Sequence, residues 1–391
     1  MPWQSWSIVG FSPPRMGMMK DLDDLFVISI EQAVAAPYAS GKLSDGGARV
    51  IKIERPEGDF ARGYDADGKG YSSYFLWLNR GKESVCLDLK NPDDVALVRR
   101  MMAKADVFIQ NLMPGAVDRL GLNMHDLRKE FPSLITCSIS GYGAEGDYSR
   151  MKAYDLLIQA ETGLSSITGG PSEPGRVGVS LCDISAGMTA YQAILQALYA
   201  RQRNGEGRHI DVSLFSALAD WMNVPYVQRH YGGKTIGRPG LHHPTIAPYG
   251  VYPCGDGGLI LLSIQNEREW AKLAGDVLGR PDMIDSDDFS SNISRVENRD
   301  ALNAVMHDVF GRFSRQEMAQ QLSDAGIAYG RLNSIDDLIN HPQTQYITTM
   351  TSAGEVKMIA PGASFDGKHM VADSVPDLGA HTAAIKDEFG Q

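Results

Sequence analysis

A glycine-rich loop is the first feature of the sequence whose spacing suggests a chemistry. Gly141, Tyr142 and Gly143 begin a G-x-G-x-x-G string that ends at Gly146 and follows the apolar run 134–139. Such loops cradle the pyrophosphate of dinucleotides. However, this motif lies a third of the way along the chain, no apolar helical period follows it, and the expected acidic partner, Glu161, falls inside a predicted helix. The pattern favours a tight turn that lets the backbone approach a ligand.

The second candidate is the carboxylate of Asp183, directly before a long helical pattern over 184–207. An aspartate in this place is a common N-cap, and spacing alone favours that structural role. A carboxylate at a helix N-terminus is also kept ionised. From the residue pattern alone, the cap is the favoured role.

Basic side chains near predicted strand ends form a third group. The chain has 391 residues and a formal charge of −11, which argues against nucleic acid and anionic membranes as partners. An anionic ligand therefore needs a local cluster of cations. Seven residues in the first half of the chain are candidate phosphate partners: Lys52, Arg55, Arg80, Lys82, Lys90, Arg119 and Lys152.

Cysteine usage and apolar runs limit the class of protein further. Four scattered cysteines, without metal-ligand spacing, indicate reduced thiols and predict neither disulfides nor a metal site. No run approaches the ~20 apolar residues of a membrane span, and residues 1–20 make a poor signal peptide. These features predict a cytoplasmic protein without membrane association.

The chain alternates between predicted strands and helices. Strands are expected at 25–30, 48–54, 86–89, 106–111 and 134–140, with helices at 33–43 and 92–105 between them. This alternation predicts an α/β fold with a mostly parallel sheet, whose ligands bind at the carboxyl ends of the strands.

The composition changes after residue 224, where glycine and proline become frequent, and three helical patterns follow, the last opened by a Ser314/Glu317 capping box. We therefore predict an N-terminal extension (1–20), a large domain (21–224 and 331–391) and a small α+β domain (225–330).

Several segments together resemble the family III CoA-transferases. They are, in order, GARVIKIERPEGD, NRGKESVCLDLKNPDD, ADVFIQNLMPGAVDRLGL, SISGYGAEGDY, GVSLCDISAGMTA, NGEGRHIDVSLFSAL and PDLGAHT. The family includes formyl-CoA and carnitine CoA-transferases and shares its fold with α-methylacyl-CoA racemase. The resemblance covers residues 25–391. It implies a Rossmann-like large domain, a small domain and an interlocked homodimer.

The resemblance also implies site residues. The catalytic nucleophile matches Asp183, and the glycine loop, with Gly141, Tyr142 and Gly143, lies beside the acyl group. No cofactor is implied beyond coenzyme A itself, which is a substrate. The positions that match its contacts are Val34, Ala35, Arg55, Leu87, Asp88, Leu89, Lys90, Asn111, Leu112, Met113, Arg119, Lys152, Ala153, Tyr154 and Asp155.

The implied reaction moves CoA from an acyl-CoA to a small carboxylic acid through a covalent aspartyl intermediate. The racemase branch has a histidine where this chain has Tyr154, and a phenol with a pKa near ~10 is a poor base. For Asp155, a hydrogen bond near the acyl group and a helix-start role are both open. His242 and His243 are candidates to meet a second carboxylate, with succinyl-CoA as donor and itaconate, mesaconate or malate as acceptor, or are ordinary loop residues.

Two alternatives to a transferase stay open at this point. One is an acyl-CoA racemase or epimerase within the same fold. The other is a non-catalytic CoA-binding protein.

Overall fold

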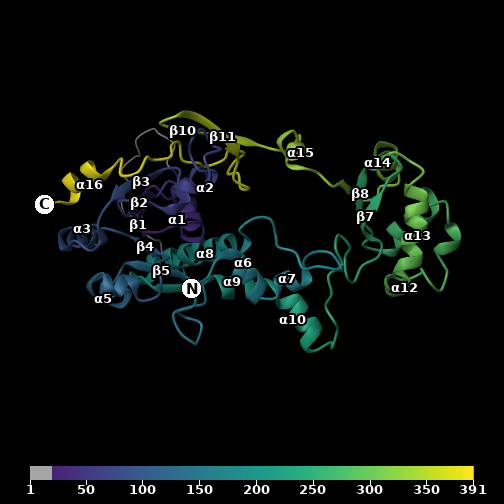
Figure 1. The fold of residues 1–391 in the computed structure, drawn as a ribbon, viewed down its shortest axis with the longest axis horizontal. Helices are drawn as coiled ribbons and strands as arrows, with labels where there is room; N and C mark the ends of the chain where they lie inside the picture. Colours follow the sequence, from purple (N-terminus) through teal and green to yellow (C-terminus); the bar gives the residue numbers. More distant parts are fainter. Residues whose placement is uncertain (1–19, 391) are drawn as a thin grey trace, which may run out of the picture. The chain divides into compact units, whose positions relative to one another are not determined.

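The computed structural model describes residues 20–390, which divide into two compact units (Figure 1). Unit 1 contains the described residues of Met1–Arg150, Asp183–Ser213 and Tyr346–Gln391; unit 2 contains Met151–Cys182 and Leu214–Gln345. The boundaries of these units differ from those of the predicted domains, because residues 151–182 belong to unit 2. The predicted N-terminal extension lies outside the described residues, except for Lys20.

Unit 1 is built on a six-stranded parallel sheet with strand order β3-β2-β1-β4-β5-β6. This is the order of the doubly wound nucleotide-binding fold, and it reverses between β1 and β4. The apolar runs form these strands because both faces of a parallel sheet are covered. The strands are β1 (Phe26–Ile30), β2 (Arg49–Glu54), β3 (Lys82–Cys86), β4 (Val107–Gln110), β5 (Ile135–Ser140) and β6 (His209–Ser213).

Helices cover both faces of this sheet. On one face, Ile28, Ile51 and Phe108 share an apolar core with α3 (Pro92–Met102), α5 (Met124–Glu130) and α16 (Thr382–Phe389). Helix α1 (Ala35–Asp45) packs on β1, β2 and β4. Helix α8 (Leu181–Asn204) contacts α1, because an added Cβ at Gly187 would lie 2.6 Å from the Ala35 carbonyl oxygen. Only glycine permits this approach.

The direction of α8 follows from contacts near its two ends. Gly187 lies against the start of α1, which follows the carboxyl end of β1. Near its other end, Arg201 bonds Asp106 at 2.7 Å and the Ser133 carbonyl at 3.1 Å, just before β4 and β5 begin. Helix α8 therefore begins at the carboxyl edge of the sheet, where ligands bind in this fold.

Two sequence predictions about these elements need correction. The third strand is Lys82–Cys86 and not 86–89, because its polar side chains are buried against partners that the sequence does not reveal. Helix α8 begins at Leu181 and ends at Asn204, so Asp183 is the third residue of its first turn and not its N-cap.

The C-terminal segment of unit 1 lies along β3. The Cys86 amide donates to the Thr382 hydroxyl at 2.9 Å, and the His381 amide donates to the Ser84 carbonyl at 3.0 Å. The hairpin β10–β11 (Tyr346–Thr351 and Gly354–Ile359) precedes this segment. The remaining helices of unit 1 are α2 (Ser73–Leu78), α4 (Ala116–Arg119) and a 3₁₀ turn (Phe60–Gly63).

Unit 2 has its own apolar core, which includes the buried Tyr252, Trp270 and Phe310. The capping box of Ser314 and Glu317 is present at the start of α14 (Arg315–Asp324), as predicted. Its strands β7 (Tyr249–Pro253), β8 (Leu259–Ser263) and β9 (Tyr329–Arg331) pair antiparallel. Its helices are α6 (Asp155–Glu161), α7 (Leu164–Ile167), α9 (Leu214–Trp221), α10 (Asn223–His230), α11 (Glu267–Lys272), α12 (Asn292–Glu297), α13 (Arg299–Phe310), α14 (Arg315–Asp324) and α15 (Ile335–Ile339).

Within residues 20–390, no helix combines the length and the apolar character needed to cross a membrane.

Candidate active site

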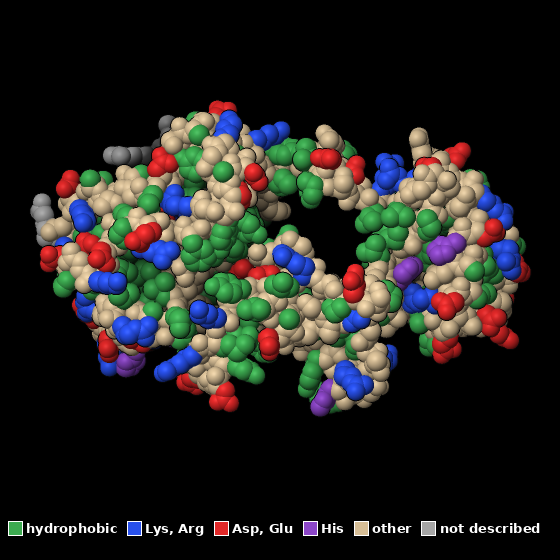
Figure 2. Space-filling view, in the orientation of Figure 1, with side chains coloured by type: hydrophobic (Ala, Val, Ile, Leu, Met, Phe, Trp, Pro, Cys, Tyr) green, Lys and Arg blue, Asp and Glu red, His purple; other side chains and the backbone are tan. Residues whose placement is uncertain are grey.

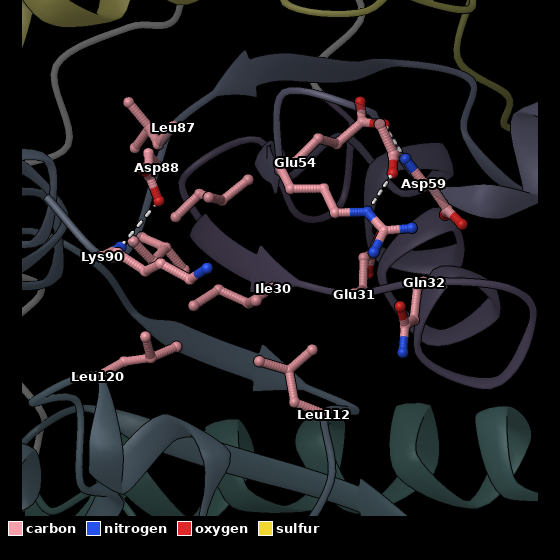
Figure 3. Close-up of a pocket in the computed structure, with 14 residues that line it drawn as sticks. Ile30, Glu31, Gln32, Glu54, Asp59, Leu87, Asp88, Lys90, Leu112 and Leu120 are labelled. Atoms are coloured by element: carbon pink, nitrogen blue, oxygen red, sulfur yellow. Dashed lines mark hydrogen bonds between the residues drawn. The ribbon is translucent and has the colours of Figure 1, made fainter.

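A cavity of about 220 Å³ opens in unit 1 where β1, β2, β3 and β4 end. It therefore lies at the carboxyl edge of the sheet, at the reversal of strand order. Figure 3 shows Leu112 and Leu120 on one side of the cavity and Glu31 with Gln32 on another. The full lining is Ile30, Glu31, Gln32, Ile53, Glu54, Arg55, Gly58, Asp59, Leu87, Asp88, Leu89, Lys90, Leu112 and Leu120.

The loop between β1 and α1 is held by hydrogen bonds to side chains. The Gln32 amide donates to Asn111 Oδ1 at 2.9 Å, and Asn111 Nδ2 returns a bond to the Gln32 carbonyl at 2.8 Å. The Ala33 amide donates to Asp59 Oδ1 at 3.0 Å. Ala33 has a φ of 61°, a left-handed conformation that costs energy for a residue with a Cβ. These bonds keep the loop in a conformation that it would not adopt alone.

Two buried ion pairs lie behind this loop. Lys52 contacts Asp59 at 2.7 Å, and Lys82 contacts Glu31 at 2.6 Å, with all four side chains fully buried. Burial favours the neutral form of Glu31, but Lys82 and Lys52 hold its pKa below the usual range. Burial lowers the pKa of Lys82 to about 8, against the attraction of Glu31.

These ion pairs correct part of the phosphate prediction. Lys52, Lys82 and Arg80 are buried and paired with carboxylates, Arg80 with Asp45. For these three the prediction is wrong, because they present no cationic surface to a ligand. Their role is structural.

A third buried carboxylate, Glu54, ends β2 and lines the cavity. It accepts from Arg62 Nη2 at 2.7 Å and from the Ser84 hydroxyl at 2.6 Å. Burial raises the pKa of Glu54, but the hydrogen bond from Arg62 and the charges of Lys52 and Arg62 outweigh it and lower the pKa to about 2. Glu54 is therefore an ionised and paired carboxylate in the cavity wall.

The cations that can reach a ligand lie on the rim of the cavity. The Arg55 side chain is 59% exposed, and its Nε donates to the Gly58 carbonyl at 3.0 Å. Lys90 is exposed, and Figure 3 shows it beside Asp88, whose carboxylate accepts the Lys90 amide at 3.0 Å. The structure thus gathers the predicted residues Arg55, Leu87–Lys90 and Leu112 around one cavity.

Other predicted contacts of coenzyme A surround this group. Val34 and Ala35 are buried where α1 begins, and Asn111 bonds the β1–α1 loop. Met113 is 58% exposed, and Arg119 is exposed at the end of α4. None of these five lines the cavity.

Asp183 lies at the same edge of the sheet as the cavity. It is half-buried in the first turn of α8, one turn before Gly187. Residues four apart share a helix face, so Asp183 and Gly187 lie on the same face of α8. At Gly187 this face contacts Ala35 and Tyr38 of α1. The N-terminal amides of the helix favour the ionised carboxylate at this position.

The glycine loop follows β5 and is largely exposed beyond Gly143. Gly143 has a φ of 100° and its amide donates to the Ser140 hydroxyl at 3.0 Å. No helix starts at Gly146, since the next helix begins at Asp155. The loop therefore lacks the helix N-terminus of a dinucleotide-binding loop.

The remaining predicted residues lie in unit 2. Lys152 and Tyr154 are exposed, Ala153 is half-buried, and Asp155 is the first residue of α6. The His243 ring stacks on Tyr249 with centroids 5.1 Å apart, and its Nδ1 accepts the Thr245 amide at 3.2 Å. Burial and the charge of Arg299 lower the pKa of both His242 and His243, which favours the neutral rings.

Several cavity residues escaped sequence analysis, above all Glu31, Gln32, Glu54 and Asp59. Their buried partners lie elsewhere in the chain, so local spacing carries no sign of them. One signal was present: Lys52 stands in the middle of an apolar strand, and a buried lysine requires an anionic partner.

Comparisons with known proteins match this arrangement. The model of a family described as CoA-transferase family III matches residues 22–382. An acetyl-CoA:oxalate CoA-transferase of Acetobacter aceti is 36% identical over 94% of this chain and 95% of its own length. A succinyl-CoA:glutarate CoA-transferase of Mus musculus is 33% identical over 95% and 86%. The crystal structure of a CAIB/BAIF family protein from Brucella suis superposes with a TM-score of 0.82, at 34% identity, covering 94% and 99% of the two chains.

The chain therefore belongs to CoA-transferase family III, and it is an enzyme that transfers CoA between carboxylic acids.

Proposed function

We propose that this enzyme moves CoA from an acyl-CoA, with succinyl-CoA as the candidate donor, to a small dicarboxylic acid through a covalent intermediate on Asp183. One observation carries the proposal. Asp183 stands in the first turn of α8, at the sheet edge that also holds the cavity, on the helix face that contacts the start of α1.

Coenzyme A has a nucleotide end with phosphates and a long flexible arm. The cavity, at about 220 Å³, is smaller than the ~300–1,000 Å³ of typical whole-ligand pockets, so it suits one part of the molecule. We place the nucleotide there, with Arg55 and Lys90 as phosphate partners. The arm then passes the loops with Val34, Ala35, Asn111, Met113 and Arg119. Lys152, Ala153 and Tyr154 stay contacts proposed from the resemblance.

The proposed chemistry has two halves, and each half consists of two acyl transfers. The first half loads CoA onto Asp183, and the second passes it to the acceptor acid. A carboxylate oxygen of Asp183 attacks the thioester carbonyl, the C–S bond breaks, and a mixed anhydride and CoA thiolate form. The thiolate then attacks the aspartyl carbonyl, the donor acid leaves as a carboxylate, and an aspartyl-CoA thioester remains. The acceptor carboxylate attacks this thioester and releases the thiolate. Finally the thiolate attacks the acceptor carbonyl and frees Asp183.

Each attack develops negative charge on a carbonyl oxygen. Backbone amides of the glycine loop at Gly141 and Tyr142, and at Gly143 once it leaves the Ser140 hydroxyl, are suited to stabilise it, because a backbone amide donates a hydrogen bond without a proton to lose. A dry site is also required, because water would hydrolyse the anhydride.

Dicarboxylic acids are the proposed acceptors. Oxalate and glutarate, in the names of the two relatives, each carry two carboxylates. His242 and His243 are candidates to bind the second one. With lowered pKa values they would act as neutral N–H donors and not as cations.

An interlocked homodimer is part of the proposal. Unit 2 exposes large apolar side chains on three helices, and Figure 2 shows such side chains in green over α6, α9 and α10. Several large apolar side chains exposed on neighbouring helices are typical of a protein interface. Sedimentation analysis should give twice the chain mass, and a monomer would contradict this part. The exposed residues are Tyr154, Leu156, Leu157, Trp221, Val224, Tyr226, Val227 and Tyr231.

The test replaces Asp183 with asparagine, which keeps the shape and removes the nucleophile. Turnover of succinyl-CoA with oxalate, glutarate, itaconate, mesaconate or malate should fall by at least ~10³-fold, while the Kd for the acyl-CoA stays within ~3-fold. Asp126→Asn, at an exposed position on α5, is the matched control.

Three results would contradict the proposal. If Asp183→Asn retained turnover, Asp183 would not be the nucleophile. If the enzyme used acetate or propionate but none of the dicarboxylic acids, the proposal that dicarboxylic acids are the acceptors would be wrong. Deuterium exchange at the α-carbon of an acyl-CoA without any acceptor acid would instead indicate a racemase.

A further inference from the structure

The first residue of α6, Asp155, is bonded to the start of α8. Its Oδ1 accepts the Cys182 amide at 2.7 Å, and Cys182 Sγ lies 3.3 Å from the Asp155 carbonyl oxygen. Cys182 is the second residue of α8, so its amide has no carbonyl partner within the helix. Asp155 therefore supplies an N-terminal cap to α8 from another helix.

A second bond extends this contact. The other carboxylate oxygen of Asp155 accepts Gln159 Nε2 at 2.8 Å, and Gln159 Oε1 accepts the Val177 amide at 2.9 Å. Gln159 is fully buried. Asp155 and Gln159 thus hold the segment 177–182 at both of its ends. Residues 171–180, which lead into α8, are mostly exposed and form no helix or strand, and the bonds to Asp155 and Gln159 hold the last part of this segment against α6.

Asp183 follows Cys182 directly, and its position depends on where α8 begins. We propose that Asp155 and Gln159 are positioning residues for Asp183: they fix the first turn of α8 and thereby the direction of the nucleophilic carboxylate. This assignment replaces the contact with coenzyme A that the resemblance implies for Asp155, and it rests on the proposed function of Asp183.

Hydrogen-bond chemistry explains why a carboxylate is needed at position 155. Both of its oxygens accept, one from an amide N–H and one from a side-chain NH₂. In Asp155→Asn one carboxylate oxygen becomes an NH₂ group. This group donates, so it cannot accept from the Cys182 amide or from Gln159 Nε2. Displacement of a reacting group by about 1 Å can cost ~10²-fold in rate.

The test compares Asp155→Asn with the double variant Asp155→Asn/Gln159→Glu. In the double variant the new amide donates to the new carboxylate, whose second oxygen still accepts the Val177 amide. We expect kcat to fall ~10²-fold in Asp155→Asn, with KM for the acyl-CoA within ~2-fold, and the double variant to recover at least ~10-fold of the loss. Glu161→Gln, at the exposed end of α6, should behave as wild type.

A second measurement does not depend on turnover. Hydrogen exchange at the Val177 and Cys182 amides should accelerate in Asp155→Asn and slow again in the double variant. Raised KM with unchanged kcat would make Asp155 a ligand of coenzyme A and overturn the inference. So would an unchanged kcat, or a double variant no better than the single one. If wild type transfers CoA but Asp183→Asn does as well, the proposed function fails, whatever Asp155 does.

Discussion

Two loops leave the same edge of the sheet in unit 1, and they are built in opposite ways. The loop after β1 contains no glycine, yet Ala33 takes a left-handed conformation and is held by Asp59, with two buried ion pairs behind it. The loop after β5 is rich in glycine and mostly exposed, and the Gly143 amide bonds only to nearby Ser140.

This contrast separates two requirements of the proposed reaction. A rigid nucleotide binds best to a loop whose conformation is fixed before binding, because ordering the loop on binding would cost affinity. In the proposed reaction, acids of different size would enter and leave beside the more exposed glycine loop. No helix begins at the end of the G-x-G-x-x-G string, so the motif alone does not identify a nucleotide-binding loop.

The largest expected difference between the loops is in stability. Asp59→Ala removes the acceptor of the Ala33 amide and leaves Lys52 buried with less compensation. It should lower the free energy of unfolding by ~3–5 kcal/mol. Ser140→Ala, the counterpart in the glycine loop, should cost only ~1 kcal/mol. Denaturant unfolding measures the free energy of unfolding of both variants. Equal losses in Asp59→Ala and Ser140→Ala would contradict the proposed difference between the two loops.

The second difference is a response to acid. The pKa of Glu54 is lowered to about 2 in the folded protein, from the usual 4.5 of a glutamate. A lowered pKa stabilises the fold above pH 4.5, and this contribution is lost as the pH falls towards 2. The loss should reach about 3 kcal/mol, at ~1.4 kcal/mol for each pKa unit. Unfolding experiments between pH 5 and 2, within the window set by the two pKa values, measure it.

Glu54→Gln should flatten this dependence on pH, whereas Glu145→Gln, in the exposed glycine loop, should keep the wild-type profile. A steep acid transition that survives Glu54→Gln would assign the effect to other carboxylates.

The smallest difference concerns backbone conformation. Gly143→Ala meets open space, but its φ of 100° is strained for any residue with a Cβ, so it should cost ~1–2 kcal/mol. Ala33→Gly relieves strain at a φ of 61° and gains flexibility in the unfolded chain, and the two should cancel to within ~0.5 kcal/mol. Thermal unfolding of both variants gives the values, and the reverse ranking would show that Ala33 is not strained.

The sequence predicted most of the sheet, because buried strands such as Phe26–Ile30 and Arg49–Glu54 are short segments rich in valine and isoleucine. It misplaced β3, where Lys82, Glu83 and Ser84 suggest a loop. These polar residues sit in a strand because Glu31 bonds Lys82, Glu54 bonds Ser84 and Arg49 bonds Glu83 across the sheet. Such partners are long-range contacts, which local periodicity does not reveal.

The sequence anticipated part of the cavity lining. Exposed residues that follow strands, such as Arg55 and Lys90, could be proposed from their position and from the resemblance. The buried groups that shape the cavity could not, because Asp59 reads as an ordinary surface aspartate until Lys52 and Ala33 are seen to bond it. The same holds for Asp155, whose partner Cys182 lies 27 residues away.

The most direct test of the account is chemical trapping of the intermediate. The enzyme is incubated with succinyl-CoA and hydroxylamine, digested, and analysed by mass spectrometry. The account predicts a hydroxamate on the peptide that contains Asp183, at that residue alone, and its absence when succinyl-CoA is omitted. An unmodified Asp183 in an enzyme that still transfers CoA would contradict the covalent mechanism.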